Sequence, residues 1–133
     1  MNGTRDFTAL VGRVLLAVLF IISGYGKIGG FDGTVQALVA KGLPLPQLAT
    51  AIAILVELGG GLLLVVGWKT RWVAGLGIIL FTIAASFLFH DFWNMADDAR
   101  ETNQIMFMKN VAIIGGLLMV VAFGPGRYSV DRK

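Results

Sequence analysis

The sequence predicts an all-α membrane protein, an antiparallel four-helix transmembrane bundle with a short amphipathic helix between the first two spans. The 133 residues are 56% hydrophobic and 14% charged, and the mean hydropathy is +0.79, which is not the composition of a soluble domain. Four apolar runs are each long enough to cross the ~30 Å hydrocarbon core at ~1.5 Å per helical residue. They cover about residues 7–25, 47–67, 72–89 and 105–123 of a single domain, 1–133.

The first run contains a stripe of cationic and small residues on one helix face. It lacks the small-residue cleavage motif of a signal peptide, so we expect it to be a retained span. Intervals of four, three, four and three residues place one set of side chains on a single helix face: Arg13, Ala17, Phe20, Gly24 and Lys27. This face is expected to point into the bundle, although Arg13 could instead extend to the nearby interface. Lys27, at the far end of the span, is expected at the opposite interface.

Residues 28–46 are too short and too interrupted to cross a membrane. Their apolar residues share one helical face: Phe31, Val35, Leu38 and Val39. Asp32 is a candidate N-cap, and Gly42 is a candidate helix stop before two prolines. The segment is predicted to be a short amphipathic helix that lies on the membrane or covers the bundle. An ordered connector is the alternative.

The second span contains an acid near its middle. Glu57 lies ten residues after Gln47 and eleven before Trp68. A charge at the bilayer centre costs roughly 2.5–3.5 kcal/mol on insertion scales, so Glu57 is expected to face the bundle interior. Small residues on its helix face would allow another helix to approach. Glu57 is therefore either a proton or ligand site, or a member of a structural ion pair, or a protonated, hydrogen-bonded acid.

The third span follows an interfacial anchor formed by Trp68 and Trp72 around two cations. Thr82, Ser86 and His90 recur every four residues and form a polar stripe that leads to the membrane surface. Histidine as a residue type titrates near neutral pH, so His90 is a candidate general acid or base. The alternative is a histidine that only makes a hydrogen bond at the interface.

The fourth span begins with polar residues. Residues 94–104 are acidic and are expected to form a water-facing loop. Lys109 and Asn110 follow about one turn inside the span. Ala112 and Gly116 provide a pair of small residues for close helix packing. The last ten residues are polar and are expected to end the helix.

The distribution of charge predicts the orientation in the membrane. Four spans place both termini on one side, with seven lysines and arginines: Arg5, Arg13, Lys69, Arg71, Arg127, Arg132 and Lys133. The other side has four: Lys27, Lys41, Arg100 and Lys109. The positive-inside rule then places both termini in the cytoplasm. Lys27, His90, Asp91, Trp93, Lys109 and Asn110 are expected to gather at the extracytoplasmic mouth.

Five segments together resemble the DoxX family of small four-span bacterial membrane proteins. They are GRVLLAVLFIISGYGKI (12–28), GLPLP (42–46), ELGGGLLLVVGW (57–68), HDFW (90–93) and MKNVAIIGGLL (108–118). The resemblance covers almost the whole chain. It implies a four-helix bundle in the bacterial inner membrane and an association with redox processes, including thiosulfate:quinone oxidoreductase and complexes of thiol and oxidative-stress defence. By motif position it also implies a set of site residues: Arg13, Lys27, Glu57, His90, Trp93, Lys109 and Asn110.

Three functions are compatible with these residues. The first is a membrane subunit of a quinone-linked redox system, an oxidoreductase or part of one. In it His90 and Glu57 transfer protons, and a second set binds the ligand: Arg13, Lys27, Trp93, Lys109 and Asn110. With no cysteine and one histidine the chain has no intrinsic redox cofactor, so a quinone and a redox partner subunit would be required.

The second function is a non-catalytic anchor or assembly module, and the third is a small lipid- or solute-binding transporter. The bilayer is the expected environment, a homo-oligomer is an option for the transporter, and nucleic acid is not an expected partner.

A specific pairing is also expected inside the bundle. Arg13 lies about six residues inside the first span and Glu57 near the middle of the second. In antiparallel helices this leaves an axial gap of three or four residues, or about 5 Å, which an arginine can bridge. We therefore expect an ion pair between Arg13 and Glu57.

The orientation can be tested with reporter fusions at the C-terminus. A cytoplasmic reporter should be active there, and a periplasmic reporter should be inactive, because the side with both termini carries the excess of cations. The opposite pattern of activity would contradict the predicted topology.

Overall fold

The computed structural model describes residues 2–132, and within this range every regular element is a helix. Four helical units are long and apolar enough to cross a membrane, which confirms the predicted fold class. They are Gly3–Gly29, Pro46–Val66, Thr70–Asn94 and Asp97–Phe123. The first is α1 and the last is α7. The second consists of α3 (Pro46–Ile54), η1 (Leu55–Gly59) and α4 (Gly60–Val66), and the third of α5 (Thr70–Trp72), η2 (Val73–Ile79), α6 (Leu80–Phe89) and η3 (Phe92–Asn94).

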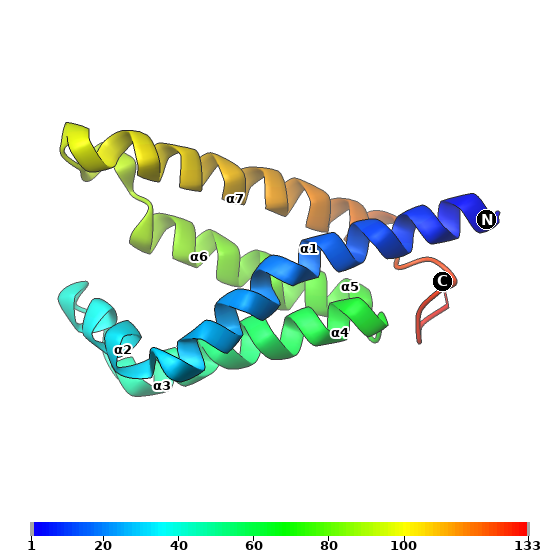
Figure 1. Ribbon diagram of the computed structural model, residues 1–133, viewed down its shortest axis with the longest axis horizontal. Helices are drawn as coiled ribbons and strands as arrows, with labels where there is room; N and C mark the ends of the chain where they lie inside the picture. Colours follow the sequence, from blue (N-terminus) through cyan, green and yellow to red (C-terminus); the bar gives the residue numbers. More distant parts are fainter. Residues whose placement is uncertain (1, 133) are drawn as a thin grey trace.

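The four units form two antiparallel pairs. α1 packs along η1 and α4, and α7 packs along η2 and α6. Figure 1 shows both termini at one end, where the pairs converge, whereas α6 and α7 diverge from α2 and α3 toward the other end. We call these the terminal end, which includes the connection at Gly67, and the open end, which includes the connections at Gly30 and Asp91.

The apolar core lies where the pairs converge. It contains seven buried residues from all four spans: Ala17, Phe20, Leu64, Ala74, Ile78, Ile79 and Leu117. Many other large apolar side chains are exposed on the outer faces of the helices, as expected for surfaces that contact lipid. The core therefore helps to fix the terminal end.

Two helices extend beyond their apolar runs. α1 begins at Gly3 because the side chain of Asn2 caps it, accepting a 2.9 Å hydrogen bond from the Arg5 amide. α7 begins at Asp97, so most of the predicted 94–104 loop is helical, and that expectation was wrong. Asp97 and Asp98 occupy its first turn, where the positive end of the helix dipole stabilises acidic side chains.

The predicted short helix between the first two spans is confirmed as α2 (Phe31–Ala40), which packs on α3 and α1. Gly42 ends it in the left-handed region at φ 75°. The Gly42 amide bonds the Val39 carbonyl and the Leu43 amide bonds the Leu38 carbonyl, which is a Schellman motif. Asp32 lies in the first turn but does not cap the helix, because Gly30 is the N-cap.

The second and third spans both contain a π-helical segment. Glu57 lies within η1, and η2 follows directly after the first turn of the third span. Such segments interrupt the regular α-helical hydrogen bonding and occur frequently at functional sites. The two segments lie against each other across the bundle.

Glycines allow α1 to approach the second span closely. A methyl group built on Gly24 would lie 2.6 Å from the Leu58 backbone nitrogen, and one on Gly61 would lie 2.7 Å from a side-chain carbon of Ile21. The first neighbour is backbone and cannot move aside, and the second belongs to a stiff β-branched side chain. The Gly24–Leu58 contact therefore fixes the axial register of the two spans.

We expect Gly24→Ala to lower the stability of the protein by about 1–3 kcal/mol, the usual cost of overpacking. Gly26→Ala is the matched control, because a methyl group there meets nothing within 4 Å. Thermal unfolding of both variants in the same detergent measures the difference. Equal unfolding temperatures would show that the register does not depend on Gly24.

Candidate functional site

Arg13 faces the bundle, as predicted, and is only 1% exposed. All of its hydrogen bonds go to backbone carbonyls. Nε donates to Leu64 (2.7 Å), Nη1 to Pro125 (2.6 Å), and Nη2 to Val65 (3.1 Å) and Tyr128 (2.7 Å). Leu64 and Val65 lie in the last turn of α4, where carbonyls lack partners within the helix. Arg13 thus neutralises a helix C-terminus and holds the C-terminal tail.

The C-terminal tail, residues 124–132, is bound to the terminal end at further points. Asp6, which is buried, accepts a hydrogen bond from the Arg127 amide. The carboxylate of Asp131 accepts from the amides of Lys69 and Thr70 and from the Thr70 hydroxyl. The tail is therefore an integral part of the fold, and its role was not apparent from its polar composition.

Glu57 forms an ion pair with Lys27 and not with Arg13, so the predicted Arg13–Glu57 pair was wrong. Lys27 Nζ lies 2.6 Å from Glu57 Oε1 and donates to the Ser23 hydroxyl at 2.9 Å. The side chain of Glu57 is 5% exposed and that of Lys27 is 26% exposed. Lys27, which was expected at the interface, reaches back along α1 to Ser23 and Glu57.

The error arose from the register of the helices. Arg13 is level with Leu64, seven residues beyond Glu57, which is about 10 Å at helical rise. The Gly24–Leu58 contact instead places Glu57 beside the last turns of α1. Side chains on a helix tilt toward its N-terminus, so Lys27 reaches the level of Gly24. The apolar runs gave no signal for this register, because α1 extends beyond its run at both ends.

The polar stripe on the third span continues onto α7. Thr82 and Ser86 are both buried, and each donates a 2.7 Å hydrogen bond to the carbonyl four residues earlier. Asn110 lies in the middle of α7 and donates from Nδ2 to the Ser86 hydroxyl at 2.9 Å. These three residues form a polar connection between the two helices in the membrane interior.

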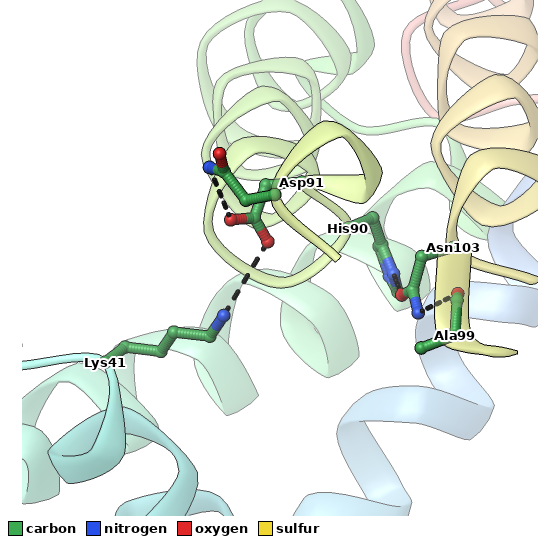
Figure 2. Close-up of polar contacts among 6 residues, drawn as sticks. Lys41, His90, Asp91, Ala99 and Asn103 are labelled. Atoms are coloured by element: carbon green, nitrogen blue, oxygen red, sulfur yellow. Dashed lines mark hydrogen bonds and ion pairs between the residues drawn. The ribbon is translucent and has the colours of Figure 1, made fainter. Parts of the chain in front are cut away.

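His90 and Asp91 occupy the end of the third span at the open end. His90 Nδ1 lies 2.9 Å from Asn103 Oδ1, and Asn103 in turn donates to the Ala99 carbonyl on α7. Figure 2 shows Lys41, from the end of α2, reaching toward Asp91 at 3.7 Å. Lys41 also lies over the ring of Phe89 at 5.9 Å. This contact joins the two diverging parts of the bundle, and sequence reasoning did not identify Lys41.

Trp93 belongs to an aromatic cluster and Lys109 to an exposed helix face. Trp93 makes edge-to-face contacts with Phe87, Phe92 and Phe107 at centroid distances of 5.2–5.9 Å. Lys109 is exposed and has no hydrogen bond or ion pair with any residue in the described range. It lies two turns before Gly116, which faces Leu16 of α1, so Lys109 is on the α1 side of α7.

The seven predicted site residues therefore do not form one cluster. Glu57 and Lys27 form one group, Asn110 joins Ser86, and His90 joins Asn103. Arg13 belongs to the terminal end and has a structural role. Lys109 is about 10 Å along α7 from the Gly116–Leu16 contact, at the depth of Ser23 on α1 and close to that of the ion pair. Within the described residues no three histidine, aspartate or glutamate side chains are placed to bind a metal ion.

Comparison with known proteins finds relatives that match almost the whole chain. The sequence profile of the DoxX family matches residues 8–91. The chain is 40% identical to the inner membrane protein YphA and 43% identical to the inner membrane protein YqjF, both from Escherichia coli K12, over 99% of this chain and 94–95% of those proteins. It is 26% identical to the Surfeit locus protein 4 homolog of Schizosaccharomyces pombe, of which it spans 39%. No solved structure matches the chain significantly.

A double-mutant cycle distinguishes the two possible partners of Glu57. Lys27→Met and Glu57→Gln should each lower stability, by less than the ~3–5 kcal/mol of a fully buried pair because Lys27 is partly exposed. The double variant should recover part of the loss, since it leaves no uncompensated charge. Thermal unfolding in detergent provides the measurement.

The matched control is the cycle of Glu57→Gln with Arg13→Leu. These two changes should be additive, because Arg13 contacts carbonyls about 10 Å away along the axis. Coupling to Arg13 together with additivity for Lys27 would contradict the observed pairing.

Proposed function

The chain belongs to the DoxX family, and on that premise we propose that this multi-pass inner-membrane protein is a subunit of a quinone-linked redox system. The proposed site is at the open end and uses residues of α1 and η1 together with residues of α6 and α7. The observation that carries the proposal is the Lys27–Glu57 pair, a buried acid with a partly exposed base, within the membrane-spanning part of the bundle.

Reduction of a quinone to a quinol takes up two electrons and two protons, and the electrons would come from a redox partner subunit. The chain's own residues would hold protons and orient the ring. Lys27 Nζ lies 2.6 Å from Glu57 Oε1 and also bonds the Ser23 hydroxyl. His90 is the corresponding group at the membrane surface, where its ring bonds Asn103.

The ring carbonyls would be bound from α7. Asn110 uses one side-chain N–H for Ser86, and an asparagine amide has a second. Lys109, one residue earlier, is exposed toward the α1 side at a depth similar to that of the ion pair. Phe87, Trp93 and Phe107 add flat apolar surface near the same helix ends. Arg13 is excluded from this role because its donors are used by carbonyls at the terminal end.

A non-catalytic module for a partner complex is the second candidate. It is favoured by the hydrogen bonding of His90, Asn110 and Arg13, each of which already has a partner within the chain. In that case the exposed Lys109 would face a partner helix. The orientation with cytoplasmic termini, which puts the open end at the extracytoplasmic surface, is part of the proposal in both cases.

Tryptophan fluorescence tests the quinone site directly. The chain has three tryptophans, and only Trp93 is near the open end. In a Trp68→Phe/Trp72→Phe variant in nanodiscs, a short-chain quinone should quench Trp93 with a saturable curve. Adding Asn110→Leu should weaken binding by about fivefold, the equivalent of one ~1 kcal/mol hydrogen bond.

The matched control is a Trp68→Phe/Trp93→Phe variant, which retains only Trp72 at the terminal end. Quinone dissolved in lipid should quench Trp72 without saturation. If Trp93 and Trp72 are quenched alike, the quinone proposal is wrong. A protein that co-purifies at fixed stoichiometry would then favour the module.

A further inference from the structure

We propose that the outer surface between the second and third spans binds one acyl chain of an anionic phospholipid, from the leaflet at the terminal end. This surface is separate from the open end, so the inference does not depend on the proposed redox function. It rests on an apolar groove of about 270 Å³ and on the residues at its mouth.

Two packed π-helical segments bound the groove. Its walls come from η1 and α4 on one side and η2 on the other: Val56, Gly60, Val73, Gly77 and Ile78. Gly60 brings the two spans close together, because a methyl group built on it would lie 3.2 Å from Ile78. A methyl group on Gly77, in contrast, meets nothing within 4 Å. The missing side chain at position 77 therefore helps to keep the groove open.

The length of the groove corresponds to one leaflet. It runs from Trp68, Lys69 and Trp72 at the connection of the two spans to Val56 in η1. Val56 and Val66 are ten positions apart, which is about 15 Å at helical rise and half of the ~30 Å hydrocarbon core. An acyl chain that starts at the interface would therefore end near the bilayer centre, at the inner end of the groove.

Charge at the mouth selects the headgroup. Lys69 is exposed, and its ammonium lies over the Trp68 ring at 5.1 Å. Arg71 is exposed two residues later. The carboxylate of Asp131 lies at the same connection and accepts three hydrogen bonds from Lys69 and Thr70, so two cations and one acid are placed there. These bonds hold the backbone of the connection at Lys69, which lines the mouth of the groove, at the level expected for a lipid phosphate.

The test uses a Trp93→Phe variant in vesicles of phosphatidylglycerol and phosphatidylcholine, in which Trp68 and Trp72 report on the groove. One sample carries bromine, which quenches tryptophan, on the phosphatidylglycerol acyl chains, and the other carries it on phosphatidylcholine. The membrane charge is the same in both. We expect phosphatidylglycerol to occupy the groove with about fivefold preference, the factor for one basic residue near an anionic lipid.

Three variants identify the origin of that preference. Gly77→Leu should fill the groove and abolish the excess quenching, and Lys69→Gln should remove the preference for phosphatidylglycerol. Gly115→Leu is the control, because position 115 is exposed on α7 and a methyl group there meets nothing within 4 Å. Equal quenching by the two lipids before these substitutions, or an unchanged preference in Gly77→Leu, would overturn the proposal.

Discussion

The bonds of Arg13 hold the terminal end of the bundle together. One buried guanidinium joins three separate parts of the chain: α1, which carries it, the last turn of α4, and the C-terminal tail. Each of those carbonyls would otherwise lose its hydrogen bonds to water in a buried position, which is costly. A lysine could not replace this contact, because only the planar guanidinium directs several donors outward at fixed angles. The terminal end therefore depends on this side chain in addition to the apolar core and the bonds of Asp6 and Asp131.

Closure at one end leaves the other end free to diverge. The core, the Arg13 bonds and the docked tail all lie at the terminal end. Toward the open end the two parts are joined by the Lys41–Asp91 contact and by few others within the described residues. The Lys27–Glu57 pair joins α1 and η1 in this divergent region. The fold thus separates a structural cation, Arg13, from the Lys27–Glu57 pair.

The sequence was sufficient for the class of fold and for the faces of the helices. The apolar runs gave the four spans, and the stripe from Arg13 to Lys27 correctly identified the inward face of α1. The partner of Glu57 could not be predicted, because it depends on axial register, and the close contact at Gly24 that sets the register links residues far apart in the chain. The carbonyl partners of Arg13 were also beyond prediction, since every residue has a carbonyl and no sequence pattern marks those that lack bonds.

Disulfide trapping provides the most direct test of the role of Arg13. The chain has no cysteine, so Val66→Cys and Val130→Cys form a unique pair, at positions whose backbones are joined by a 3.0 Å hydrogen bond. With Arg13 present, mild oxidation should give a high yield of the intramolecular disulfide. With Arg13→Lys the yield should fall sharply while the helical content by circular dichroism is unchanged, because the tail leaves the end of α4. An equal yield in both backgrounds would show that the tail docks without the guanidinium and would contradict this account.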